Sequence, residues 1–252
     1  MTAETARIPH LDIARSAAIL AMVVYHTAFD LEMFGWLAPG TAFAQPLRGL
    51  AIATASSFLA LAGISLVLAH GRGIRWPGFW RRFAKIAGAA ALISIATYIW
   101  APQQFIYFGI LHAIAALSLL GLLALRWAIP ALVAAAAIAL AAPVILTPML
   151  AQLALAGPEF AGSGPAWLAW TGLIRPVPPA LDFVPLLPWA APFLAGMALA
   201  RIGEATGLWH RLAAAPALPA ALAWPGRHAL VIYLVHQPIL IALIWAGTAL
   251  LR

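Results

Sequence analysis

The first long apolar stretch of the chain contains ionisable side chains, and four of them have spacings typical of one helical face. The stretch reads LDIARSAAILAMVVYHTAFDLEMFGW and contains Asp12, Arg15, His26 and Asp30. His26 follows Arg15 by eleven residues, close to three helical turns, so the two side chains share a face and lie about 16 Å apart along the axis. Asp30 is four residues beyond His26, on the same face and within reach of its ring. The pattern therefore predicts a polar stripe along one helix.

This stripe contains groups suited to proton transfer and to binding an anion. Neutral His is a general base near pH 7, and a carboxylate such as Asp30 can orient an imidazole and stabilise its protonated form. Arg15 can bind a phosphate group. The alternative is that Asp12–Arg15 and His26–Asp30 are structural pairs that anchor the helix ends, because buried pairs also occur without function.

Two later apolar segments carry further polar side chains. His112 lies in YFGILHAIA, and Tyr233, His236 and Gln237 lie in HALVIYLVHQP. Since an ionisable group inside a membrane span is costly, each is a candidate functional residue. We expect His26, His112 and His236 to converge on one cavity, although a single membrane histidine is more often a hydrogen-bonded packing residue. Imidazoles also suit zinc, but there is no closely spaced histidine pair, and we expect no metal.

The connectors contribute two more sets of candidates. Asp182, in LDFVPLLPW, is either a substrate-binding lid carboxylate or an ordinary loop acid. The connector HGRGIRWPGFWRRFAK is basic, and its arginines are typical of a face anchored to anionic lipid. Three of them, Arg72, Arg81 and Arg82, are also candidates for attracting a phosphate-bearing donor such as coenzyme A.

The composition requires these residues to be positioned by membrane helices. Of the 252 residues, 65% are hydrophobic and only 8% are charged, whereas soluble domains have about 25% charged residues. Lipid must therefore cover the surface, and apolar runs of about 20 residues predict spanning helices. We expect an all-α, polytopic membrane helix bundle of about seven transmembrane helices that forms a single domain, 1–252. The predicted spans are 11–31, 47–69, 83–100, 105–125, 129–150, 186–202 and 227–250.

The distribution of basic residues predicts the orientation of these spans. A cytoplasmic N-terminus and an outer C-terminus place eleven of the fourteen Lys and Arg residues on the cytoplasmic side, as the positive-inside rule requires. Only Arg48, Arg175 and Arg252 fall outside. The net charge of +7 is thus explained by short loops, and no nucleic-acid partner is expected. The chain has no cysteine, which excludes disulfides and acyl-cysteine chemistry.

Several segments together resemble a known family. RIPHLDIARSAAILAMVVYHTAFDL, FLALAGISLVLA, IYFGILHAIA, FVPLLPWAAPFLAGMALA and GRHALVIYLVHQPIL are similar, in this order, to the bacterial relatives of heparan-α-glucosaminide N-acetyltransferase. Arg15 and His26 also match the Arg-x10-His motif of the wider transmembrane acyltransferase group, which includes the type-3 acyltransferases. The resemblance implies a cytoplasmic acyl-CoA donor and an acceptor on the far side of the membrane.

The leading hypothesis is therefore a multi-pass acyltransferase of a bacterial inner membrane, with acetyl-CoA as donor and a sugar or other hydroxyl or amine as acceptor. Its expected catalytic residues are His26, Asp30, His112 and His236. Arg15, Arg72, Arg81 and Arg82 are expected to bind the donor, and Asp182, Tyr233 and Gln237 the acceptor. The alternatives are a proton-coupled transporter or flippase that uses the same histidines and Asp30, and a non-catalytic scaffold. The sequence is compatible with a monomer and with a homo-oligomer.

Overall fold

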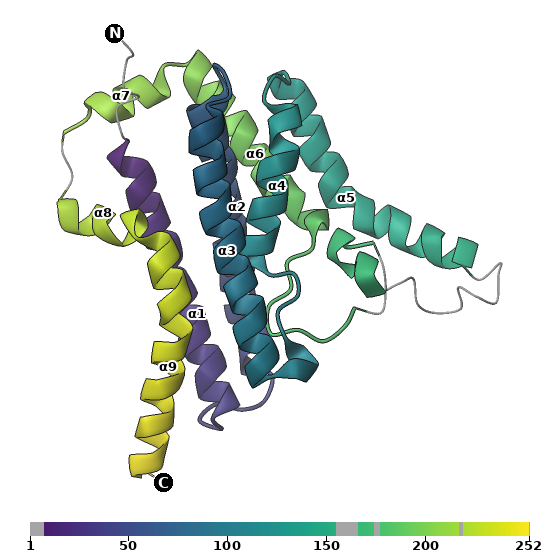
Figure 1. Ribbon diagram of the computed structural model, residues 1–252, viewed down its shortest axis with the longest axis vertical. Coiled ribbons are helices and arrows are strands. Elements are labelled where there is room, and N and C mark those ends of the chain that lie inside the picture. The colour runs from purple at the N-terminus through teal and green to yellow at the C-terminus, as the bar shows by residue number, and fades with distance from the viewer. Residues whose placement is uncertain (1–7, 155–165, 174–176, 217–218, 252) are drawn as a thin grey trace. The chain divides into compact units, whose positions relative to one another are not determined.

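The computed structural model describes residues 8–154, 166–173, 177–216 and 219–251, and their regular structure is helical (Figure 1). The long helices are α1 (Pro9–Met33), α2 (Leu47–His70), α3 (Trp76–Trp100), α4 (Ile110–Ala124), α5 (Ile129–Ala154), α6 (Leu186–Ala205) and α9 (Ala229–Leu251). Shorter elements are η1 (Thr41–Phe43), η2 (Pro102–Gln104), η3 (Ala166–Thr171), α7 (Leu208–Ala214) and α8 (Ala220–Arg227). Arg7, Arg175, Arg252 and parts of the connector at 151–185 lie outside the described residues.

The all-α, polytopic membrane architecture predicted from composition is confirmed. Six described helices are long and apolar enough to cross a membrane: α1, α2, α3, α5, α6 and α9. The seventh predicted helix, α4, has 15 residues and is about 22 Å long, which is shorter than the hydrocarbon core of about 30 Å.

The ends of two predicted helices were wrong, for physical reasons. Helix α3 begins at Trp76 rather than at residue 83, because the basic connector is itself helical and carries a proline in its first turn, where the missing N–H costs nothing. Helix α4 begins at Ile110 rather than at residue 105. The preceding residues are extended, and Phe108 forms a parallel bridge with Phe183. Both α7 and α8 lie in a segment that was predicted only as a connector.

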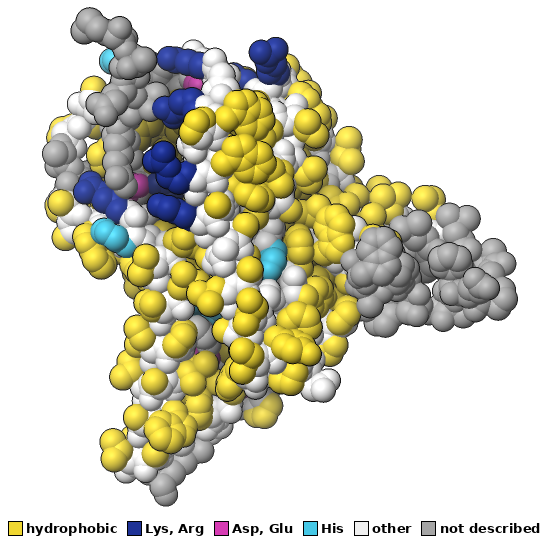
Figure 2. Space-filling view, in the orientation of Figure 1, with side chains coloured by type: hydrophobic (Ala, Val, Ile, Leu, Met, Phe, Trp, Pro, Cys, Tyr) yellow, Lys and Arg dark blue, Asp and Glu magenta, His cyan; other side chains and the backbone are white. Residues whose placement is uncertain are grey.

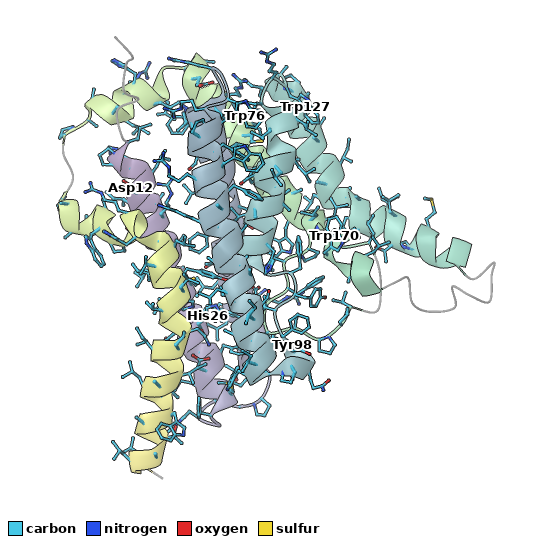
Figure 3. The ribbon with its side chains drawn as sticks, viewed as in Figure 1. Asp12, His26, Trp76, Tyr98, Trp127 and Trp170 are labelled. Atoms are coloured by element: carbon cyan, nitrogen blue, oxygen red, sulfur yellow. The ribbon has the colours of Figure 1, made fainter. Side chains whose placement is uncertain are left out.

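The helical surface is strongly apolar. Large hydrophobic side chains point outward, for example Val144 (77% exposed) and Leu250 (86% exposed). Figure 2 shows hydrophobic side chains along most of the visible helical surface. Trp76 and Tyr98, both labelled in Figure 3, are exposed at opposite ends of α3. They lie about 33 Å apart along the helix, as aromatic residues at the two faces of a bilayer do.

The chain forms two compact units, and the boundaries between them fall inside α2 and α6. One unit contains Leu59–Ile202. Its core joins α2, α4 and α6 through small residues: a Cβ on Gly63 would lie 2.1 Å from the carbonyl oxygen of Phe193, and one on Gly196 would lie 2.1 Å from that of Ala60. Such close backbone approach is typical of packed membrane helices. Arg201 of α6 also donates a hydrogen bond to the carbonyl of Leu125, at the end of α4.

The other unit contains Met1–Phe58 and Gly203–Arg252. In it, α1 packs against both α8 and α9. A Cβ on Gly226 of α8 would lie 1.8 Å from the carbonyl oxygen of Asp12, so a glycine is required where α8 meets α1. At its other end, α1 is joined to α9 by a hydrogen bond from Trp36, just beyond α1, to Thr248.

Candidate functional site

The residues predicted to carry chemistry are divided between the two units. The unit of α1 and α9 holds Arg15, His26, Asp30, Tyr233, His236 and Gln237. The unit of α3, α4 and α6 holds Arg72, Arg81, Arg82, His112 and Asp182. Each set is described within its own unit.

Two of the three predicted histidines meet where α1 packs against α9. The ring centroids of His26 and His236 lie 5.0 Å apart, in an edge-to-face arrangement with an interplanar angle of 61°. Figure 3 shows where His26 lies along α1. The two imidazoles come from helices that are distant in sequence, so tertiary packing alone creates this pair.

The tautomer of His236 follows from its hydrogen bond to the backbone. His236 Nδ1 lies 2.7 Å from the carbonyl oxygen of Tyr233. A carbonyl oxygen only accepts hydrogen bonds, so Nδ1 donates, and in the neutral ring Nε2 carries the free lone pair. His236 is 8% exposed, and its Nε2 is buried without a partner among the described residues. The ring is therefore set up to accept a proton at Nε2.

Asp30 is paired with Gln237 and not, as its spacing suggested, with His26. Gln237 Nε2 donates to Asp30 Oδ1 over 2.6 Å, and Asp30 is completely buried. In the described part of the chain, the buried atoms Asp30 Oδ2, Gln237 Oε1 and His26 Nδ1 have no hydrogen-bond partner. The ring of Tyr233 lies 5.6 Å from that of His236, so all five residues belong to one polar cluster between two helices.

This cluster, which we call the histidine-pair cluster (His26, Asp30, Tyr233, His236 and Gln237), is rich in hydrogen-bond acceptors. Asp30 Oδ2 and Gln237 Oε1 accept, and so does His236 Nε2 in its neutral tautomer. Buried polar atoms normally have partners. The cluster therefore suits a ligand that brings hydrogen-bond donors, such as a hydroxyl or an amine.

His112, the third histidine, has both ring nitrogens engaged in its own unit. The N–H of Gly109 donates to Nδ1 over 3.2 Å, so Nε2 carries the hydrogen in the neutral ring. Nε2 lies 3.1 Å from Ser94 Oγ, and Ser94 Oγ in turn donates to the carbonyl of Ile106 over 2.6 Å. These bonds hold the extended residues before α4 against α3, an arrangement that needs no ligand.

Asp182 performs a similar structural task at the start of α4. Its Oδ2 accepts the N–H of Ile110 over 3.0 Å, which satisfies one of the free donors of the first helical turn. A Cβ on Gly109 would lie within 2.3 Å of the same oxygen. Burial raises the pKa of the Asp182 carboxyl above its ordinary value, while the bond from Ile110 acts in the opposite direction.

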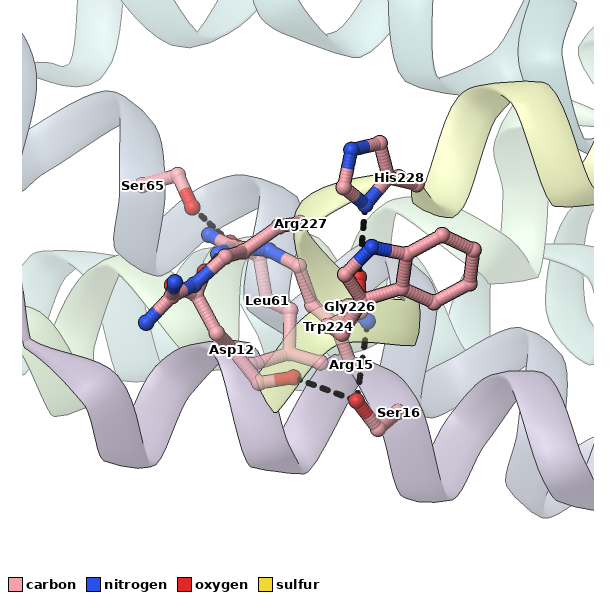
Figure 4. A network of polar contacts seen from close by, with 9 residues as sticks. All are labelled: Asp12, Arg15, Ser16, Leu61, Ser65, Trp224, Gly226, Arg227 and His228. Carbon is pink, nitrogen blue, oxygen red and sulfur yellow. Dashed lines mark hydrogen bonds and ion pairs between the residues drawn. The ribbon is translucent and has the colours of Figure 1, made fainter. Parts of the chain in front are cut away.

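Arg15 lies at the cytoplasmic end predicted for α1 and is part of a charged network with α8 (Figure 4). Its Nη1 donates to Oδ1 of Asp12 over 2.7 Å, and Arg227 Nε lies 3.6 Å from Oδ2 of the same carboxylate. Ser16 Oγ donates to the Asp12 carbonyl over 3.1 Å and accepts the N–H of Gly226 over 2.8 Å. Asp12 is 2% exposed, and the two arginines flank it.

The predicted donor-binding arginines of the basic connector lie at and just before the start of α3. Arg72 and Arg81 are exposed, and Arg82 is half-buried. Arg75 nearby donates from Nε to the carbonyl of Ala69 over 3.1 Å. In the described residues, no group of three or more His, Cys, Asp or Glu side chains is arranged to hold a metal ion.

Sequence reasoning missed three residues that the structure brings into these clusters: Ser94, Gly226 and Arg227. A signal existed for Arg227, because it is a basic residue that directly precedes a long apolar helix. None existed for Ser94, which is one of several hydroxyl residues in apolar helices.

The comparison with family models agrees with the resemblance of the motifs. Residues 7–238 match the family model described as "Heparan-alpha-glucosaminide N-acetyltransferase, catalytic". The match covers every residue of the histidine-pair cluster, as well as Asp12, Arg15 and Arg227. No curated protein and no solved structure matches the chain.

Proposed function

We propose that this chain, which belongs to the family of heparan-α-glucosaminide N-acetyltransferase catalytic domains, transfers an acetyl group from cytoplasmic acetyl-CoA to a hydroxyl or amine on the far side of the membrane. Family membership indicates a membrane acetyltransferase. To this we add four proposals: the donor, the acceptor, the sides of the membrane on which each binds, and a location in a bacterial inner membrane. All 252 residues would act as one acyltransferase domain.

The observation that carries the proposal is the acceptor-rich histidine pair between α1 and α9. His236 has a fixed tautomer with a free Nε2, and His26 lies in edge contact with it. Asp30 and Gln237 each offer a further buried, unpaired oxygen. This set favours a substrate with several hydrogen-bond donors, such as a sugar, and supplies a base for the group that is acylated.

The chemical step requires a proton acceptor and a leaving thiol. The acceptor hydroxyl or amine loses its proton to His236 Nε2 and attacks the thioester carbonyl. The C–S bond breaks, and the CoA thiolate takes the proton from His236. In the two-step route, His26 first attacks the thioester, the C–S bond breaks, and the CoA thiolate takes the proton of the His26 ring, which leaves an acetyl-imidazole. The acceptor then loses its proton to His236 Nε2 and attacks the acetyl group, and the His26 ring takes this proton as it leaves. Acetyl-CoA labelled in its acetyl group distinguishes the two routes. In the absence of acceptor, only the two-step route leaves the label on the protein.

The arginines would serve the donor. Arg15, with its charge partly neutralised by Asp12, lies about 16 Å along α1 from His26, comparable to the length of a pantetheine arm. Exposed Arg72 and Arg81, with half-buried Arg82, would attract the anionic donor to the membrane surface. His112 and Asp182 would act by holding the start of α4, since their polar atoms already bind backbone groups.

The test measures CoA release by the protein in proteoliposomes, with acetyl-CoA as donor and glucosamine and glucose as acceptors. Because the chain has no cysteine, a thiol reagent detects CoA without background from the protein. We expect acceptor-dependent release that falls by about 10²-fold or more in His26→Ala and in His236→Ala. Exposed His210 on α7 provides the matched control, His210→Ala.

Two results would contradict the proposal. One is wild-type activity in the double variant His26→Ala/His236→Ala. The other is solute uptake driven by a proton gradient without thiol release, which is what a proton-coupled transporter predicts.

A further inference from the structure

The junction of α8 and α9 presents an exposed aromatic pair beside the arginines of the Asp12 network, and the proposed function uses only Arg15 of this group. Trp224 and His228 have ring centroids 4.5 Å apart and an interplanar angle of 35°. His228 Nδ1 lies 2.9 Å from the carbonyl of Trp224, which fixes the imidazole over the indole. The indole is nevertheless 56% exposed. Figure 4 shows both rings close to the Asp12–Arg15–Arg227 network.

The charge of this network favours an anion. Arg15 and Arg227 both approach the carboxylate of Asp12, so two of the described cationic side chains face this one carboxylate. Arg227 is the more exposed of the two, with 37% of its side chain accessible. A guanidinium has five N–H donors, and the contact with Asp12 involves only Nε of Arg227. The remaining donors suit phosphate oxygens.

The backbone holds these groups rigidly in place. Gly226 allows α8 to approach α1 closely, since a Cβ there would lie 1.8 Å from the Asp12 carbonyl oxygen. The bond from Gly226 N–H to Ser16 Oγ closes the same contact. Trp224 and Arg227 therefore lie on either side, in sequence, of the contact that Gly226 makes with α1. Such pre-organisation lowers the entropy lost on binding.

We infer that this junction binds a nucleotide bearing phosphates. The base stacks on the indole of Trp224, and Arg227, with Arg15 behind it, binds the phosphates. Stacking of bases on aromatic side chains tolerates any base, and a guanidinium recognises phosphate in a bidentate manner. If the proposed function is correct, this nucleotide is the adenosine bisphosphate part of acetyl-CoA, and the junction lies at the end of α1 opposite to the Asp30 end of the stripe.

The test is direct binding of adenosine 3′,5′-bisphosphate to the full chain in nanodiscs of neutral lipid, by calorimetry. We expect the wild type to bind, and Trp224→Leu and Arg227→Gln each to weaken binding about tenfold. The matched controls are Trp245→Leu and Arg211→Gln. Trp245 is an exposed tryptophan on α9, and Arg211 is an exposed arginine on α7. Both should bind like the wild type. Because Trp224 is exposed, its replacement is expected to leave folding intact, which thermal unfolding checks.

The outcomes separate this inference from the proposed function. Nucleotide binding that depends on Trp224 and Arg227 supports the site even if no acetyl transfer occurs. If both variants transfer acetyl groups with the KM for acetyl-CoA of the wild type, the nucleotide site is wrong and the proposed function stands. If Trp224→Leu alters only the affinity for vesicles of phosphatidylglycerol and not for the nucleotide, the indole is a lipid anchor and the inference is wrong.

Discussion

The three intramembrane histidines differ in how their ring nitrogens are used. Both nitrogens of His112 are occupied, by the Gly109 N–H and by Ser94. His236 donates from Nδ1 to a carbonyl and keeps Nε2 free, and His26 Nδ1 has no partner in the described residues. A base needs a lone pair that is not already engaged. We therefore propose that His26 and His236 carry the chemistry, while the contacts of His112 join the start of α4 to α3.

This difference predicts the effect of His236→Asn. An asparagine amide can replace the Nδ1 donor to the Tyr233 carbonyl, but it offers no base at the position of Nε2. We expect thermal unfolding close to that of the wild type, with acetyl transfer reduced by about 10²- to 10⁴-fold. The same change at exposed His210 serves as control. Full activity in His236→Asn would show that Nε2 takes no proton in the reaction.

At the scale of elements, the contact between α1 and α8 depends on one glycine. Gly226 lies where a Cβ would meet a backbone oxygen at 1.8 Å, whereas a Cβ on Gly247 of α9 would meet nothing within 4 Å. A backbone atom cannot rotate away as a side chain can, so the helices would have to separate.

Gly226→Ala is accordingly expected to destabilise the protein by about 3 kcal/mol, at the upper end of overpacking effects. Gly247→Ala should be neutral or slightly stabilising, because alanine favours helix. Thermal unfolding in detergent measures both variants. Equal melting temperatures for the two would mean that α8 does not pack on α1 in this way.

The cap of α4 predicts a dependence on pH. Because burial raises the pKa of Asp182, the folded protein holds this proton more tightly than the unfolded chain does. The carboxyl therefore favours folding below its unfolded pKa, and that contribution is lost as the pH rises through the folded pKa. Asp182→Asn keeps an oxygen that caps the helix and does not titrate.

We expect the melting temperature of Asp182→Asn, relative to the wild type, to rise as the pH increases above the ordinary pKa of an aspartate, about 4. Asp182→Ala, which lacks the cap, should be less stable than Asp182→Asn at every pH, by about 1 kcal/mol. A constant difference between wild type and Asp182→Asn would argue against the raised pKa.

At the scale of the whole molecule, the distribution of Lys and Arg predicts which connectors face the cytoplasm. The absence of cysteine makes single-cysteine labelling direct. Ala44 precedes α2 and Ala214 ends α7, and both are exposed. In intact cells, a membrane-impermeant maleimide should label Ala44→Cys, and should label Ala214→Cys only after permeabilisation. The reverse pattern would invert the orientation and place the donor arginines outside.

The helical class, the approximate spans and the polar stripe of α1 could be predicted from the order of the amino acids. The physical reason is that these features are local. A run of apolar residues long enough to cross a bilayer must satisfy its backbone hydrogen bonds as a helix, and a fixed helical repeat then sets which side chains share a face. The start of α3 was misplaced because basic residues in a helix resemble a loop when only hydropathy is considered.

Which polar groups are partners depends on how the helices pack against one another. Asp30 and His26 share a face of α1, yet Asp30 bonds to Gln237, 207 residues further along the chain. His26 meets His236 because α9 packs on α1, and α8 approaches α1 because Gly226 has no side chain. Contacts between helices depend on the shapes of both surfaces, which no spacing within one helix encodes.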